Sequence, residues 1–227
     1  MTREDEPLGQ PLAVNYAGET LWLLPEHALW WPARRVLWIA DLHLGKAATY
    51  RALGQPVPAG TTQENLARVS QLLHAYQPSQ LVFLGDFLHA VQARTESLLS
   101  GLAAWRQQHA TLTCVLVRGN HDSRAGDPPP SLGIETVNEP WAMGPFAACH
   151  HPQQHPTQAV IAGHLHPALQ LRGQGRDRLR LPCFCMESRL LVLPAFGEFT
   201  GGWNVLPEAG RQLFPVGGGT VWRLPET

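Results

Sequence analysis

The sequence has only one lysine, Lys46, and its other 16 basic residues are all arginines. Asp and Glu together number 18, so the net charge is −1 and the chain as a whole is not an electrostatic nucleic-acid binder. Any contact with nucleic acid must come from a local group of arginines, whose planar guanidinium suits bidentate phosphate binding. A GC-rich coding bias would also favour arginine over lysine, and both explanations stay open.

Long apolar runs are also missing. None approaches the roughly 18 residues that a membrane span needs. The first residues, Met1 to Glu6, are acidic. They lack the basic segment followed by an apolar one that a secretory signal has. We therefore expect no membrane association and a cytoplasmic location.

Cysteine is scarce, and the four cysteines lie in apolar segments typical of strands: Cys114, Cys149, Cys183 and Cys185. We expect them to be buried and reduced. Cys183 and Cys185 are separated by one residue and have no partner pair, which excludes a zinc knuckle.

The length and the order of apolar segments predict one α/β domain spanning residues 1–227. Two strand–helix–strand units are expected between Val36 and Val117, with one helix starting at a Thr61/Glu64 capping box and a second over Thr95–Gln108. Residues 45–60 are expected to form a loop. After Asn120 the chain should contain short strands and turns. This order favours two sheets packed face to face with helices outside.

Five polar motifs each follow an apolar run typical of a buried strand. In chain order they are Asp41-Leu42-His43, Gly85-Asp86, Gly119-Asn120-His121-Asp122, Cys149-His150-His151 and Gly163-His164-Leu165-His166. Each motif alone could be an ordinary turn. Five together, each at a strand end, predict one metal-binding crevice, because ligands gather outside the carboxyl ends of strands in open α/β sheets.

The chemistry of these side chains suits divalent cations. One carboxylate can bridge two cations about 3.5–4 Å apart, and water held between them ionises near neutral pH. Neutral imidazole and amide ligands add no negative charge, so an anionic phosphate can still enter. Mixed nitrogen and oxygen ligands without thiolate suit manganese, iron or zinc.

This motif set is similar to that of the calcineurin-like metallophosphoesterases, and the similarity covers Trp38 to His166. The resemblance implies a four-layer αββα sandwich of two mixed β-sheets flanked by helices, with two metals at the strand ends. It also implies the ligands. Asp41, His43, Asp86 and His166 would hold the first metal, and Asp86, Asn120, His150 and His164 the second, with Asp86 bridging.

Three further roles follow from the resemblance or from position. His121 resembles the histidine that protonates the leaving oxygen or stabilises the transition state, and Asp122 would orient it by a hydrogen bond. His150 is preferred over His151 as the ligand, although either follows the strand. His89, three residues after Asp86, resembles a histidine in the Gly-Asp-Leu-Phe-His element of double-strand-break repair nucleases; a purely structural role is the alternative.

Three stretches, Ala40 to Ala48, Pro56 to Thr62 and Leu193 to Gly202, resemble one bacterial family, the ligase-associated DNA damage response endonucleases. That resemblance implies manganese-dependent DNA cleavage and association with a DNA ligase, a helicase and an exonuclease-like protein. The arginine-rich hairpin that follows His166 fits this reading, because Arg176, Arg178 and Arg180 could hold DNA phosphates. A charged hairpin tip can also be merely solvated.

The sequence leaves two enzyme classes and one non-enzymatic role to compare. The first is a metal-dependent DNA endonuclease or phosphodiesterase in repair. The second is a phosphodiesterase or phosphatase for a small substrate, such as a cyclic nucleotide, a nucleotide or a pyrophosphate. A non-enzymatic interaction module is disfavoured, because a decayed site should have lost ligands and none is missing here. An open basic groove would favour the first class, and a closed cup the second.

Overall fold

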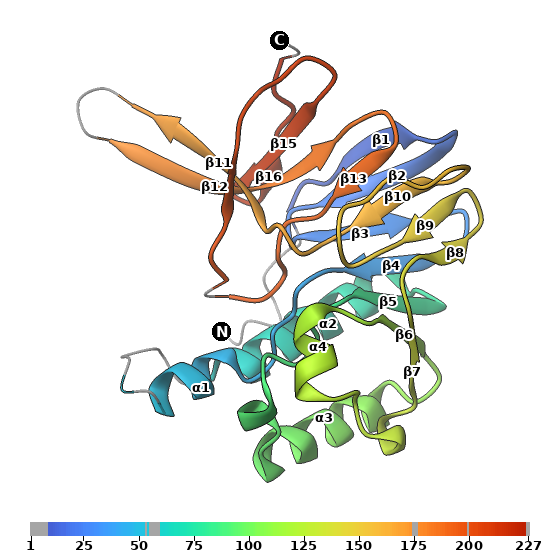
Figure 1. The fold of residues 1–227 in the computed structure, drawn as a ribbon, viewed down its shortest axis with the longest axis vertical. Coiled ribbons are helices and arrows are strands. Elements are labelled where there is room, and N and C mark those ends of the chain that lie inside the picture. Colours follow the sequence, from blue (N-terminus) through green and yellow to red (C-terminus); the bar gives the residue numbers. More distant parts are fainter. Residues whose placement is uncertain (1–8, 53, 55–59, 174–176, 199, 226–227) are drawn as a thin grey trace.

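The computed structural model describes residues 9–52, 54, 60–173, 177–198 and 200–225, and two β-sheets packed face to face dominate it (Figure 1). The first sheet has seven strands in the order of the sequence. They are β1 (Leu12–Tyr16), β2 (Glu19–Leu24), β3 (Ala28–Trp31), β4 (Val36–Ile39), β5 (Gln80–Leu84), β6 (Thr113–Val117) and β7 (Ile134–Val137). Strands β1 to β4 are antiparallel, and β4 to β7 are parallel.

The second sheet has nine strands and is also mixed. They are β8 (Trp141–Met143), β9 (Phe146–Ala148), β10 (Ala159–Ala162), β11 (Pro167–Arg172), β12 (Arg178–Met186), β13 (Leu190–Val192), β14 (Trp203–Val205), β15 (Gln212–Gly217) and β16 (Thr220–Val221). Strands β9, β10 and β13 run parallel in the middle of this sheet. The hairpin of β11 and β12 projects from the body of the molecule (Figure 1).

The described helices all come from the first half of the chain or shortly after it. They are α1 (Lys46–Ala52), α2 (Thr61–Tyr76), α3 (Glu96–Gln108) and α4 (Asn120–Ala125), with short 3-10 turns η2 (Val91–Ala93) and η3 (Pro130–Leu132). Helices α2 and α3 bury their apolar residues against one face of the seven-stranded sheet. None of the helices in these ranges is long and apolar enough to cross a membrane.

Alternation along β4 explains how one strand serves two cores. Leu37 and Ile39 face the helices, whereas Val36 and Trp38 face the second sheet. Successive side chains of a strand point to opposite faces, so a strand buried on both faces must be apolar throughout. Between the sheets, the ring of Phe146 meets Trp31 and Trp38 edge-on at centroid distances of 5.0 and 5.5 Å.

The predicted pair of mixed sheets with flanking helices is confirmed. The four cysteines are free and buried, as expected. Three local predictions were wrong. Gly60, not Thr61, caps α2, and no side chain makes the cap hydrogen bond. Part of the expected loop after Gly45 forms α1, and a short helix, α4, follows Gly119.

The two sheets bring the ends of their strands together at one edge of the molecule. The Asp41 N–H donates to the Gly85 carbonyl, which joins the segments after β4 and β5. The His164 N–H donates to Asp41 Oδ2 at 2.9 Å, which joins the segment after β10 to the first sheet. The five motifs therefore meet in space although about 125 residues separate the first from the last.

Candidate metal centre

The first group of converging side chains combines Asp41, His43 and His166. His43 Nε2 lies 3.4 Å from His166 Nε2, and His166 Nε2 lies 3.4 Å from Asp41 Oδ1. The ligand atoms of all three residues lie within 4.8 Å of one another. Asp41 Oδ1 is buried and has no hydrogen-bond partner among the described residues. Two imidazole nitrogens and an unpaired carboxylate oxygen facing one point are the donor set of a cation site.

The second group combines Asn120, His150 and His164. His150 Nε2 lies 2.9 Å from Asn120 Oδ1 and 3.0 Å from His164 Nδ1. His150 Nδ1 lies 3.0 Å from the Leu84 carbonyl, to which an Nδ1–H would donate. That tautomer leaves the Nε2 lone pair directed at the group, as ligating histidines require.

Asp86 lies between the two groups and contacts both. Its Oδ1 is 3.4 Å from His150 Nε2, and its Oδ2 is 3.7 Å from His43 Nε2. The His121 backbone N–H donates to Oδ1 at 2.9 Å, which fixes the carboxylate. One oxygen thus faces each group, as a bridging ligand needs. The residues present therefore fit two divalent cations.

The backbone at these residues is unusual. Positive φ angles occur at Asp41 (54°), His43 (47°), Asp86 (50°), His164 (71°) and His166 (48°), none of which is glycine. The left-handed region costs a non-glycine residue of order 1–3 kcal/mol and is concentrated at functional sites. Nothing in the apolar periodicity of the chain requires such turns, so their grouping indicates a site.

Two motif glycines are explained by close approach. Gly85 has φ of +80°, and a Cβ there would run into the ring of His150. At Gly163 a Cβ would lie 2.7 Å from Asp41 Oδ2. Both positions need the absence of a side chain so that ligands from the two sheets can meet.

His121 and His89 lie together beside this centre. Their rings stack with centroids 5.0 Å apart, and both contact the ring of His43 edge-on. His121 Nδ1 lies 2.6 Å from the His89 carbonyl oxygen, and Nε2 lies 3.9 Å from Asp86 Oδ2. The two histidines predicted from sequence are therefore neighbours of the candidate metal ligands.

The expected hydrogen bond from Asp122 to His121 is wrong. Asp122 is fully buried, and its carboxylate instead accepts the backbone N–H groups of Phe87, Leu88 and Gly119 at 3.0, 3.2 and 2.9 Å. Burial nevertheless raises the pKa of Asp122 more than these bonds lower it. Asp122 holds the segment after Asp86 against the start of α4, and the His89 carbonyl takes the partner position at His121.

His150 and His151 have different partners, although their ligand atoms and that of His164 all lie within 4.8 Å of one another. His150 is completely buried and faces Asp86 and Asn120. The ring of His151 pairs through Nδ1 with Glu139 Oε1 at 2.6 Å. Glu139 Oε2 also accepts the backbone N–H groups of both histidines. The role of Glu139 could not be predicted from the sequence, because a carboxylate that accepts backbone N–H groups at a strand end has no motif of its own.

Burial sets the protonation of the histidines. It lowers the pKa of His43, with Lys46 adding to the effect, and it lowers the pKa of His164. Burial first, then Lys46 and His121, lowers the pKa of His89 to about 4. Neutral imidazole is the form that binds a metal.

Lys46 is a residue of this site that the sequence analysis did not select. It is 9% exposed, and its electrostatic partners include Asp86 and Asp41. It is the only lysine of the chain and lies three residues after His43, but nothing in the sequence indicates that its side chain is buried.

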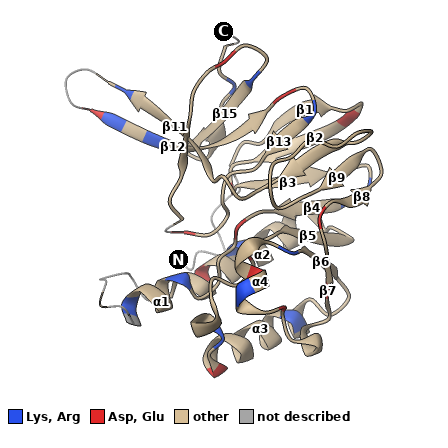
Figure 2. Cartoon of the chain, viewed as in Figure 1, with Lys and Arg blue, Asp and Glu red and all other residues tan. Residues whose placement is uncertain are grey.

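The arginines of the hairpin lie on one face of β11 and β12. Arg178 is opposite Arg172, Arg180 is opposite Gln170, and all three arginines are exposed (Figure 2). A hollow of about 150 Å³ is lined by both His166 and Arg180, with the Thr200–Gly202 segment beside them. Arg180 Nη2 donates to the Gly202 carbonyl. The hairpin therefore reaches the metal centre, while Arg176 lies outside the described residues.

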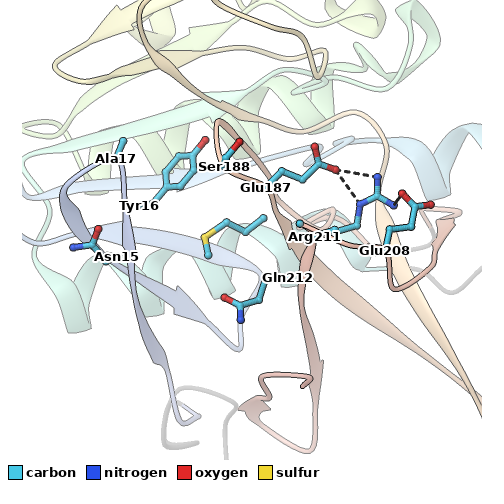
Figure 3. Close-up of a pocket in the computed structure, with 10 residues that line it drawn as sticks. Asn15, Tyr16, Ala17, Glu187, Ser188, Glu208, Arg211 and Gln212 are labelled. Carbon is cyan, nitrogen blue, oxygen red and sulfur yellow. Dashed lines mark hydrogen bonds and ion pairs between the residues drawn. The ribbon is translucent and has the colours of Figure 1, made fainter. Parts of the chain in front are cut away.

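A larger hollow of about 340 Å³ lies between the β1–β2 turn and the start of β15 (Figure 3). Its one arginine, Arg211, pairs with Glu187 and Glu208 at 2.9 Å each. None of the metal-binding residues lines it. The larger volume of this hollow does not make it the active site, because its charged side chains are already paired with each other.

Comparisons with known proteins agree with this geometry. The family model of the calcineurin-like phosphoesterases matches residues 34–146. The crystal structure of Pseudomonas putida nuclease MPE is 48% identical, covers 95% of this chain and 100% of its own, and superposes with a TM-score of 0.84. Yfce, a phosphoesterase from E. coli, is 15% identical over 79% of this chain and 87% of its own, with a TM-score of 0.41. No curated protein sequence matches significantly.

The chain belongs to the calcineurin-like phosphoesterase family. It is a metal-dependent hydrolase of phosphate esters, and its converging histidine and aspartate side chains are the candidate ligands of the metal.

Proposed function

We propose that this protein is a two-metal phosphodiesterase that cleaves DNA in ligase-associated repair. The observation that carries the proposal is Asp86, which directs one carboxylate oxygen at each of two groups of ligand atoms. The 48% identity of the chain to Pseudomonas putida nuclease MPE supports a nucleic-acid substrate. The repair role rests on the resemblance of the segments after β4 and β13 to the ligase-associated endonucleases.

The proposed ligands divide into two sets that share Asp86. Asp41, His43, Asp86 and His166 hold one cation, and Asp86, Asn120, His150 and His164 hold the other. Manganese suits this mixture of nitrogen and oxygen atoms, with iron and zinc as alternatives. When bound, the two cations activate water for attack on phosphorus and offset the charge that develops on the phosphate oxygens.

The surrounding residues handle the proton and the position of the ester. His121 Nδ1–H donates to the His89 carbonyl, which leaves Nε2 free to exchange a proton with the leaving oxygen. His89 supports the ring of His121 by stacking and is placed to contact a phosphate oxygen. Asp122 positions two of the proposed ligands indirectly. It accepts hydrogen bonds from the backbone N–H of Phe87, next to Asp86, and of Gly119, next to Asn120.

DNA is proposed to follow the hairpin into the centre. Arg178 and Arg180 share a face that leads to the hollow beside His166, and Arg176 is assigned to the same path from sequence alone. An arginine-lined approach fits a polymer with many phosphates better than a small ester. The partners expected from the family resemblance are a DNA ligase, a helicase and an exonuclease-like protein. The proposed location is the cytoplasm, where reductants would keep the four thiols free.

A substrate panel tests this proposal. The metal-free protein is reloaded with Mn²⁺ and given plasmid, single-stranded oligonucleotide, a cyclic nucleotide, a small model diester and a monoester. We expect cleavage of DNA and of the small diester, and none in chelator. Asp86→Asn should lower metal content and reduce the rate by orders of magnitude, whereas Asp127→Asn, at an exposed ion pair, should change neither.

Two outcomes would count against the proposal. Full activity of the Asp86→Asn variant, with metal content measured by elemental analysis, would end the two-metal assignment. Turnover of small esters without any DNA cleavage would favour a small-molecule phosphodiesterase or phosphatase.

A further inference from the structure

Lys46 is a buried residue with 9% of its surface exposed, and among the described residues its ammonium forms no ion pair. The ring of Tyr50 lies near it, with its centroid 5.8 Å from Nζ. Burying an unpaired charge is costly, so a retained one indicates a partner that is not part of the chain.

The backbone fixes Lys46 relative to Asp86. Leu44 and Leu88 form an isolated bridge, in which the Leu44 N–H donates to the Phe87 carbonyl and the His89 N–H donates to the Leu44 carbonyl. Gly45 packs so closely on Ala93 that it has no room for a Cβ. The Lys46 N–H then donates to the His43 carbonyl at 3.1 Å. The base of this side chain is therefore tied to the two segments that carry Asp86 and His43.

The ring of Tyr50 connects Lys46 to the candidate metal centre, because it also meets the ring of His89 edge-on at a centroid distance of 5.9 Å. Asp86 and Asp41 act on Lys46 electrostatically, and Lys46 acts in turn on His43 and His89. Two divalent cations held by those two carboxylates would leave a net positive charge, and they would repel an ammonium. Lys46 would add to that charge, and an anionic ligand would offset it.

We propose that Lys46 contacts a phosphoryl oxygen of the bound phosphodiester, an inference that rests on the proposed function. The ammonium donates a hydrogen bond to a non-bridging oxygen, on the side of the site formed by α1. A compact, flexible point charge suits this position, where the oxygen shifts as the ester bond breaks. The same contact holds a product phosphomonoester or free inorganic phosphate.

Inorganic phosphate is the probe, because its binding is measured without catalysis. Calorimetry compares phosphate binding to the Mn²⁺-loaded parent, Lys46→Met and Lys46→Arg. Met keeps most of the stem and removes the charge, whereas Arg keeps the charge. Arg51→Met removes one charge from the exposed end of the same helix and is the matched control.

We expect Lys46→Met to weaken phosphate binding roughly ten- to hundredfold, the range of a charge-assisted hydrogen bond. Its manganese content should equal that of the parent, and its Tm without phosphate should not fall. Lys46→Arg should retain part of the affinity, and Arg51→Met nearly all of it. KM for the small diester should rise in Lys46→Met in parallel with the loss of phosphate affinity.

Three results would overturn the assignment. Phosphate binding by Lys46→Met at the parent's affinity would show that no phosphoryl contact exists. Loss of manganese or of Tm in that variant would assign Lys46 to the architecture of the site, and an equal loss in Arg51→Met would show only a general charge effect. Failure of the proposed function is separate, because it would appear as a loaded parent that binds phosphate and hydrolyses no diester.

Discussion

Single residues carry most of the chemistry, and His150 and His151 show how sharply neighbours can differ. His150→Ala should remove a ligand atom that lies 2.9 Å from Asn120 Oδ1, and we expect loss of about one metal per chain. His151→Ala removes the pairing with Glu139 and the ring contacts with His150 and His164, and it should keep both metals. Elemental analysis after dialysis distinguishes them. Equal metal content in the two variants would contradict the ligand assignment.

His121 is expected to act through its proton rather than through the metal. His121→Ala should keep the metal content and slow cleavage of an unactivated diester by roughly 10²–10⁴-fold, the range of general acid catalysis. Esters with acidic leaving groups need no proton, so the variant should slow their hydrolysis less. Rates across a series of leaving groups measure this. A loss that is the same for every ester would rule out the leaving-group role.

His89 should separate DNA cleavage from hydrolysis of a small ester. Its ring stacks on His121 and has an unpaired buried Nδ1, so it has capacity for one more polar contact. We expect His89→Ala to reduce kcat/KM for DNA more than for a small diester, while the backbone carbonyl that binds His121 remains. Parallel kinetics on both substrates test this. An equal reduction for both would indicate that His89 only supports His121.

At the scale of elements, the arginine face of the β11–β12 hairpin is expected to bind phosphates outside the metal centre. Each neutralised phosphate contributes a log–log salt slope of about −0.9 on duplex and −0.7 on single strands. Arg178→Ala with Arg180→Ala should therefore weaken DNA binding and flatten that slope by roughly one to two. Turnover of a small diester should stay near that of the parent.

The control for the hairpin is a pair of exposed arginines elsewhere, Arg34 and Arg35, replaced in the same way. Binding curves at several salt concentrations give the slopes. If both double variants bind DNA with the parent's slope, the hairpin is a solvated projection. The nucleic-acid assignment would then depend on the comparison with the nuclease and on His89.

Elements also show what the sequence could and could not predict. Strand β10 begins and ends where its apolar run does, because a strand buried on both faces must be apolar throughout. The partner of Asp122 could not be predicted, since its hydrogen bonds reach Phe87 and Leu88 across 35 and 34 residues. Lys46 was missed for a related reason. A charged residue after a motif gives no sign in the sequence that its side chain will be buried.

At the scale of the whole molecule, two sheets formed by different parts of the chain share one site. We expect the free energy of unfolding of this molecule to depend on pH. His27 is not one of the candidate metal ligands. Its Nδ1 donates to the Ala195 carbonyl at 3.1 Å. Burial first, and Arg68 second, lowers its pKa to about 4, against 6.5 in an unfolded chain. As the pH falls from about 6.5 to 4, the unfolded state takes up a proton that the folded state does not. The free energy of unfolding should therefore decrease across that window and level off below it.

His27→Gln should flatten this decrease, because glutamine can keep a donor near the Ala195 carbonyl but does not titrate. Urea unfolding of the metal-free protein at several pH values between 4 and 7.5 measures it, and working without metal removes the pH dependence of ligand binding. His74→Gln, at the exposed end of α2, is the matched control. Burial lowers the pKa of His43 and His164 as well, so part of the decrease should remain in the variant. A pH profile of His27→Gln that is identical to the parent's would show that this histidine does not couple protonation to folding.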